Sequence, residues 1–163
     1  MRSRLVVLWG ITTAALFLDW LGKEWALGIT GGMLKIVPHF IEINTLRNKG
    51  IIFGWGSDLD PLHLIVIRVC TILLLFALVI AVSRLKWSVL EPIRSRYKLQ
   101  AGLLLILAGG TSNALESLLR GFVTDYISLF RLPVINLSDI LILAGCVMIL
   151  ITIFRTEYAS HTV

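Results

Sequence analysis

One stretch, Gly121-Phe-Val-Thr-Asp-Tyr-Ile-Ser-Leu-Phe-Arg-Leu-Pro-Val-Ile-Asn-Leu-Ser-Asp139, is the part of the chain around which the rest is organised. It carries two carboxylates, Asp125 and Asp139, fourteen residues apart. An apolar run over residues 140–154 follows Asp139, and another, over residues 99–108, ends before Asp125. An acidic side chain at the edge of hydrocarbon is costly unless it is paired or used. Two of them on either side of a proline-containing loop therefore indicate one shared site.

The composition predicts an integral membrane protein. The chain has 163 residues, 57% of them hydrophobic, and its mean hydropathy is +0.89, which is too apolar for a soluble domain of this size. The net charge of +5 is spread through loops, so no nucleic-acid-binding arm is expected. Cys70 and Cys146 lie in apolar runs, and His39, His63 and His161 are scattered, so we expect neither a metal site nor a cofactor.

Four apolar runs are long enough to cross a membrane as helices, at roughly 5–27, 62–83, 99–117 and 137–154. The segment at roughly 33–57 has β-branched residues in partial alternation and frequent glycines, which predicts a small β element. The expected fold is therefore an all-α integral membrane protein, a single membrane domain over residues 1–163. It has four transmembrane helices and a small extracytoplasmic β element on the membrane face.

The positive charges predict the orientation of these helices. Eight lie at the two termini and in the 84–98 loop, and six lie on the opposite side, with Arg68 inside the second span counted on neither. We therefore expect both termini and the 84–98 loop to be cytoplasmic, and the segments 28–61 and 118–136 to face outward. The shared site is then expected near the outer face.

Polar residues of three spans are expected to lie at one depth. Asp19 and Asn113 are each fourteen residues beyond the start of an apolar run, which is about 21 Å at helical rise. Lys23 is one turn beyond Asp19, and Glu116 is one turn beyond Asn113. The residues expected to converge in this outer layer are Asp19, Asn113, Glu116, Asp125 and Asp139.

Some of these residues have a structural alternative. Asp19 and Lys23 could be only an intrahelical ion pair, and Asn113 could join a contact between helices through small residues. Asn136 could cap the fourth helix, with help from Ser138.

Asp139, Asp125 and Arg68 differ in whether a purely structural role would explain them. Asp139 could interact favourably with the dipole of the fourth helix in its first turn. Asp125 lacks such an alternative, because a lone aspartate is a poor strand or core residue. Arg68, inside the second span, is expected to snorkel outward, to pack between helices or to pair with a carboxylate.

Two close aspartates indicate peptide hydrolysis. Because both cannot ionise cheaply, they share one proton. The ionised partner draws a proton from water, which attacks the carbonyl carbon, and the protonated partner polarises the carbonyl oxygen. The sequence offers no Ser-His or Cys-His pair as an alternative.

Five ordered motifs over nearly the whole chain resemble bacterial lipoprotein signal peptidase (signal peptidase II), an aspartic membrane peptidase family. The motifs are Leu18-Asp-Trp-Leu-Gly-Lys23, Arg47-Asn-Lys-Gly-Ile-Ile-Phe53, Asn113 in a glycine-rich helix, Val123-Thr-Asp-Tyr-Ile127 and Pro133-Val-Ile-Asn-Leu-Ser-Asp139.

The resemblance implies that Asp125 and Asp139 are catalytic. It also implies a substrate, a prolipoprotein with a diacylglyceryl-modified cysteine, which is cut just before that cysteine in the bacterial cytoplasmic (inner) membrane. Membrane lipids and globomycin-type inhibitors are the other expected partners, without metal or nucleic acid. Substrate-binding roles are expected for Asn48, Gly50, Asn113, Asn136, Asp19, Lys23 and Glu116.

The sequence departs from the family pattern at several positions. The family usually has Asp-Arg where this chain has Glu116 and Ser117, and we expect Arg68 or Arg120 to support Glu116 instead. Smaller departures are Ser112 for the usual Gly, Ser138 for Ala and Ile135 for Phe.

Two other functions are weighed against peptidase activity. The first is a non-catalytic relative that binds lipidated transmembrane segments; the loss of arginine at Ser117 favours it, and retention of both aspartates opposes it. The second is a small proton- or ion-coupled transporter. The inner halves of the spans are almost wholly apolar, which disfavours a transporter.

Overall fold

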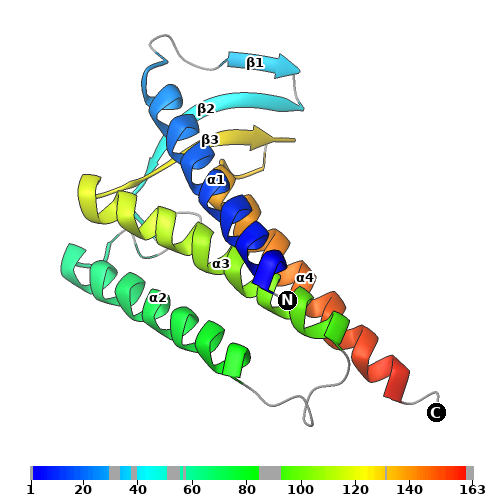
Figure 1. The fold of residues 1–163 in the computed structure, drawn as a ribbon. Helices are drawn as coiled ribbons and strands as arrows, with labels where there is room; N and C mark the ends of the chain where they lie inside the picture. Colours follow the sequence, from blue (N-terminus) through cyan, green and yellow to red (C-terminus); the bar gives the residue numbers. More distant parts are fainter. Residues whose placement is uncertain are drawn as a thin grey trace.

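The computed structural model describes residues 2–29, 34–37, 40–50, 56, 58–84, 93–130 and 132–160 of the chain. Within these ranges the chain forms four helices and three strands. In chain order they are α1 (Arg2–Leu27), β1 (Leu34–Val37), β2 (Ile41–Asn48), α2 (Pro61–Arg84), α3 (Ile93–Arg120), β3 (Val123–Leu129) and α4 (Leu137–Ser160). Figure 1 shows the sheet at one end of the helices and both chain termini towards the other end.

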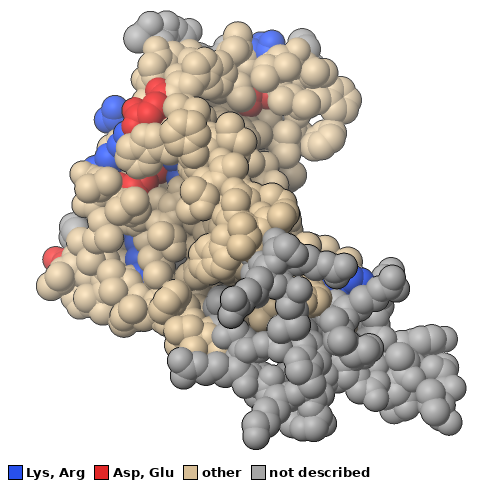
Figure 2. All heavy atoms as spheres, in the orientation of Figure 1, with Lys and Arg blue, Asp and Glu red and all other residues tan. Residues whose placement is uncertain are grey.

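Each of the four apolar runs forms a helix, as the sequence predicts. Two stretches, Tyr97–Arg120 and Leu137–Phe154, are long and apolar enough to cross a membrane, and Leu62–Leu78 is a shorter apolar helix. Large apolar side chains on the outer faces of α2 and α4 are exposed, including Leu74 and Leu150. In Figure 2 the charged side chains gather near one end of the visible face, and the rest of its described surface carries almost none.

The fold is mostly helical with a small β element, as the sequence predicts, but this element is not limited to roughly 33–57. The sheet has the order β1-β2-β3 and is antiparallel, so its third strand comes from residues 123–129, far along the chain. Asp125 lies in β3 opposite Leu46 of β2. A lone aspartate is a poor strand residue, so this position was not expected. The strand tolerates this aspartate because its carboxylate has hydrogen-bond partners. Residues 33, 38–39, 51–55 and 57 of the predicted β element lie outside the described ranges.

The sheet is attached to α1 by a small apolar core. Ala26 of α1, Ile43 of β2 and Tyr126 of β3 are buried together. A Cβ atom at Gly22 of α1 would lie 2.5 Å from the Tyr126 hydroxyl, so the glycine gives the tyrosine ring its space. The carboxyl end of α1 therefore holds β3 in place.

The turn from α3 into β3 explains why the helix ends where it does. Gly121 follows the last residue of α3 and has φ +77°, a left-handed conformation that suits glycine. Its N–H donates to the carbonyl of Ser117 at 2.9 Å, which satisfies one of the last helical carbonyls. The chain then turns directly into the strand that carries Asp125.

Glycines let α3 and α4 approach closely. A Cβ atom at Gly145 of α4 would lie 2.5 Å from the backbone carbonyl oxygen of Gly102 in α3. A Cβ atom at Gly102 would lie 2.8 Å from the carbonyl oxygen of Gly145. The two backbones therefore touch without intervening side chains, a contact typical of small residues between membrane helices.

This contact predicts that Gly145→Ala lowers the free energy of unfolding by about 1–3 kcal/mol, because the new methyl group forces two backbones apart. Thermal or denaturant unfolding in detergent measures the change. Gly10→Ala in α1 is the matched control, because the space within 4 Å of a Cβ there is empty of described atoms. The control should be stabilised by roughly 0.5–1 kcal/mol. Equal stability of the two variants would contradict this account of the contact.

Candidate active site

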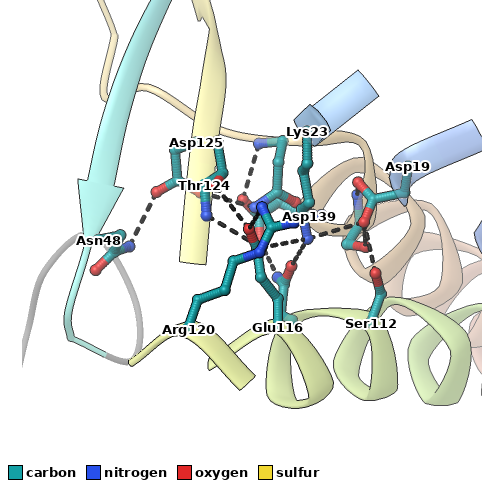
Figure 3. Close-up of polar contacts among 12 residues, drawn as sticks. Asp19, Lys23, Asn48, Ser112, Glu116, Arg120, Thr124, Asp125 and Asp139 are labelled. Atoms are coloured by element: carbon teal, nitrogen blue, oxygen red, sulfur yellow. Dashed lines mark hydrogen bonds and ion pairs between the residues drawn. The ribbon is translucent and has the colours of Figure 1, made fainter. Parts of the chain in front are cut away.

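A buried ammonium group lies at the centre of the polar layer. The Nζ atom of Lys23 is 2.8 Å from Asp19 Oδ2 and 3.1 Å from Glu116 Oε2, and it donates to Asn113 Oδ1 at 2.7 Å. An ammonium group has three hydrogens, so each of them has an acceptor here. Figure 3 shows the side chains of Asp19, Lys23 and Glu116 converging from α1 and α3. The structure thus brings together the residues that the sequence predicted at one depth.

Each of the two carboxylates beside Lys23 binds a residue on another element. Glu116 accepts hydrogen bonds from Thr124 Oγ1 at 2.6 Å and from Thr124 N at 3.1 Å. Asp19 accepts from Ser138 N at 3.0 Å and from Ser138 Oγ at 2.7 Å. The interaction between Asp19 and Lys23 is therefore more than the intrahelical pair that the sequence left open.

Asp19 also accepts a hydrogen bond from Ser112 Oγ at 2.5 Å. Ser112 and Ser138 are two of the positions at which the chain departs from the pattern of the family that it resembles. Both added hydroxyl groups donate to the same atom, Asp19 Oδ2. No pattern in the sequence predicts this contact, because the two serines lie on different helices.

Asp125 projects from β3 and is 3% exposed. Its two carboxylate oxygens accept from two amides, Oδ2 from Asn48 Nδ2 at 3.0 Å and Oδ1 from Asn136 Nδ2 at 2.7 Å. Burial raises the pKa of Asp125 to about 6, and the charge of Asp139 adds to the rise, while the hydrogen bonds from the two amides lower it. Asp125 is thus poised to exchange a proton near neutral pH.

Asp139 lies in the first turn of α4 and takes part in capping that helix. Its backbone N–H donates to Asn136 Oδ1 at 2.9 Å, and its Oδ2 accepts from the backbone N–H of Asn136 at 3.1 Å. This reciprocal pair is a capping box, so the structural alternative for Asn136 is confirmed. The other oxygen, Oδ1, accepts from Asn113 Nδ2 at 2.9 Å.

Three asparagine amides point their N–H groups at the aspartates for one common reason. The side-chain oxygen of each is held by a donor, so its NH₂ group must face the other way. For Asn48 the donor is the N–H of Gly50 at 2.9 Å; for Asn113 it is Lys23, and for Asn136 it is the N–H of Asp139. Asn136 thereby contacts both aspartates with one side chain.

The two aspartates line a single cavity of about 480 Å³. One wall comes from α2 and the opposite wall from α4. The apolar side chains that form these walls include Ile67, Ile72, Ile140, Leu143 and Cys146. The polar side chains in the lining are Asn48, Arg68, Thr71, Asn113, Asp125 and Asp139. An apolar cavity with a few convergent polar groups is typical of a ligand site.

Of the two arginines expected to support Glu116, the structure brings Arg120 to it and uses Arg68 elsewhere. Arg120 Nη1 is 3.6 Å from Glu116 Oε1, and its Nη2 pairs with Glu24. Arg68 donates from Nη1 to Ser117 Oγ and from Nη2 to the carbonyl oxygen of Gly50 at 2.6 Å. A guanidinium group from α2 therefore reaches the position where the resembled family carries its arginine.

Within the described ranges, no group of three or more His, Cys, Asp and Glu side chains could hold a metal ion. The site also includes two residues that the sequence analysis did not select, Thr124 and Ser112. For Thr124 a signal was available, because it directly precedes Asp125 and carries a hydroxyl group.

Comparison with known proteins gives consistent findings. The family model for signal peptidase (SPase) II matches residues 11–155. A lipoprotein signal peptidase of Bartonella tribocorum is 30% identical over 162 residues, covering 95% of this chain and 90% of the relative. One of Clostridium novyi is 26% identical over 158 residues, covering 93% and 96%. A solved structure of a bacterial membrane enzyme has the same fold, with a TM-score of 0.76 at 21% identity, covering 93% and 89%.

The contacts of Asp125 predict the effect of Asn48→Leu. The ionised carboxylate loses one donor, so the pKa of Asp125 should rise above about 6. Carbon-13 NMR titration of labelled aspartate measures the pKa, with Asp125→Asn to assign the signal. Thr45→Val on the same strand is the control, because its hydroxyl donates to the carbonyl of Ala26 and should leave the titration unchanged. An unchanged or lower pKa in Asn48→Leu would contradict the assigned role of the amide.

Proposed function

The chain belongs to the signal peptidase II family and processes lipoprotein signal peptides, and we propose that Asp125 and Asp139 are the two carboxylates that perform the hydrolysis. The observation that carries this proposal is the cavity. Both aspartates line it, each with two hydrogen-bond donors, between apolar walls that suit a lipid-embedded substrate. Aspartic proteolysis requires two carboxylates facing one reacting bond.

We propose different roles for the two aspartates at the start of the reaction. Asp125 is the acid, because burial raises its pKa to about 6 and so favours the protonated form. Asp139 is the base, since its carboxylate accepts a backbone N–H at the positive end of α4, where a negative charge is favoured. The two groups titrate as a coupled pair.

In the proposed mechanism, a water molecule gives a proton to Asp139 while its oxygen attacks the scissile carbonyl carbon. Asp125 gives its proton to the carbonyl oxygen, which yields a neutral tetrahedral intermediate. The intermediate then collapses as its hydroxyl proton returns to Asp125, and the carbon–nitrogen bond breaks. Asp139 passes its proton to the leaving amine, which restores the starting state of both groups.

We propose that the substrate is a prolipoprotein with a diacylglyceryl-modified cysteine, cut just before that cysteine. The apolar walls from α2 and α4 would accept its signal-peptide side chains and acyl chains. Asn48, Asn113 and Asn136 would orient the aspartates, and Gly50 would hold Asn48. Globomycin-type inhibitors and membrane lipids would occupy the same apolar cavity.

The proposed location is the bacterial cytoplasmic membrane. All four helices would cross it, both termini would be cytoplasmic, and the sheet would lie at the outer face. The arrangement in Figure 1, with the sheet and the termini towards opposite ends of the helices, supports this topology. So do the apolar outer faces of α2 and α4.

One observation bears on the non-catalytic alternative. Ser117 stands where the resembled family has arginine, which favours a relative without activity. The hydrogen bond from Arg68 to Ser117 weakens that argument, because it returns a guanidinium group to the place.

The function predicts that Asp125→Asn and Asp139→Asn each lower the rate of cleavage at least about a hundredfold, because each removes an acid–base group. A gel-shift assay in detergent with a diacylglyceryl-modified prolipoprotein measures the rate. Asp58→Asn, an exposed loop position, is the matched control and should cleave like the wild type. Wild-type protein that is folded and binds the modified substrate without cutting it would move the assignment to the non-catalytic relative.

The roles of the pair also predict a pH dependence. Asp125 must be protonated in the free enzyme, and it loses that proton as the pH rises through about 6. The value of kcat/KM should therefore fall about tenfold per pH unit above that point. Steady-state rates between pH 5 and pH 8, at roughly half-unit steps, test this. A value of kcat/KM that rises across the whole interval would reverse the two roles.

A further inference from the structure

Three charged side chains near the proposed dyad take no part in the mechanism above. Asp19, Lys23 and Glu116 are 0%, 1% and 0% exposed. None of them is among the described residues that line the cavity. A substrate in the cavity therefore has no surface of these residues to contact, although their charges require a strong reason for burial.

The contacts of the two acids follow one pattern. Glu116 accepts both the hydroxyl and the backbone N–H of Thr124, and Asp19 accepts both the hydroxyl and the backbone N–H of Ser138. Thr124 directly precedes Asp125, and Ser138 directly precedes Asp139. Each buried acid thus accepts two hydrogen bonds from the residue next to one member of the dyad.

Both of these buried acids also pair with Lys23. Its Nζ atom binds Asp19 Oδ2 at 2.8 Å and Glu116 Oε2 at 3.1 Å (Figure 3). Consecutive Cα atoms are about 3.8 Å apart, so fixing Thr124 and Ser138 leaves their neighbours little freedom. One ammonium group therefore links the strand that carries Asp125 to the helix that carries Asp139, and so fixes the distance between them.

The third hydrogen of Lys23 acts on the dyad by another route. It is donated to Asn113 Oδ1, which turns Asn113 Nδ2 towards Asp139 Oδ1 at 2.9 Å. Without the ammonium group the amide could rotate and present its oxygen to the carboxylate. Lys23 thus acts on the backbone beside Asp139 and on the side chain that donates to it.

We propose that Lys23, Asp19 and Glu116 form a buried bracket that sets the separation of Asp125 and Asp139, and that they act on the reaction through this dyad and not through the substrate. The inference rests on the proposed function of the two aspartates. It replaces substrate contact, which the sequence suggested for these three residues, with a positioning role.

Two variants of different severity test the bracket. Lys23→Met removes the shared charge and keeps a long apolar side chain. Because this variant leaves two buried acids without their counterion, it risks failing to fold. Thr124→Val is the milder test, since it removes only the hydroxyl bond to Glu116 and keeps the side-chain shape and the N–H bond. Thr124→Ser restores the hydroxyl. Thr152→Val is the matched control, because it also removes a buried hydroxyl, one that donates to the carbonyl of Met148 within α4.

The kinetic readout separates positioning from substrate contact. Thr124→Val should lower kcat about tenfold with KM within about twofold of the wild type, because a displaced dyad affects the transition state alone. Thr124→Ser should recover the rate, and Thr152→Val should match the wild type. A rise in KM at unchanged kcat would overturn the proposal, as would a lower melting temperature with both kinetic constants unchanged.

A second readout does not need activity. If the bracket loosens, Asp139 moves away and water enters, so the pKa of Asp125 in Thr124→Val should fall from about 6 towards the ordinary range. Carbon-13 NMR titration measures this, and an unchanged value would overturn the bracket. If wild-type protein does not cleave the modified substrate, the proposed function fails, and this titration still decides whether the bracket exists.

Discussion

The ammonium group of Lys23, buried and bound to three acceptors, is the interaction on which the rest of the structure depends. A buried charge is retained only where partners replace the water that it has lost. Its acceptors lie on α1 and α3, and those acceptors in turn hold β3 and α4. The elements that carry the site are therefore joined by polar contacts at one end of the helices, while close backbone contact at Gly102 and Gly145 joins α3 to α4.

Directionality is the second constraint. An amide side chain presents a donor on one side and an acceptor on the other. It presents its donor to a given partner only if its rotation is fixed. Asn48, Asn113 and Asn136 are each fixed by a group that only donates, so their N–H groups reach the dyad already oriented. A site whose dipoles need not reorganise during a reaction stabilises charge far better than mobile water does.

The sequence predicts the helices well, because a long apolar run in lipid has one way to satisfy its backbone. It also predicts that Asp19 and Asn113 share a depth, because helical rise is fixed. It fails for β3, since the partners that make Asp125 acceptable there lie on β2 and before α4. The partners of Arg68 could not be predicted either, because contact between α2 and the turn at Gly50 depends on how the helices pack and not on spacing along the chain.

The capping box at the start of α4 gives Asp139 a second duty, with an evolutionary consequence. The same carboxylate that is assigned to water activation also closes the first turn of the helix through the N–H of Asn136. A lineage that lost the reaction would still be selected to retain an acceptor at this position, because an acidic side chain in the first turn of a helix is worth about 0.3–1 kcal/mol. Persistence of Asp139 in a relative is thus a poor marker of activity. Asp125 caps no helix and is costly to bury. Its replacement in a relative is therefore the better marker that the activity has been lost.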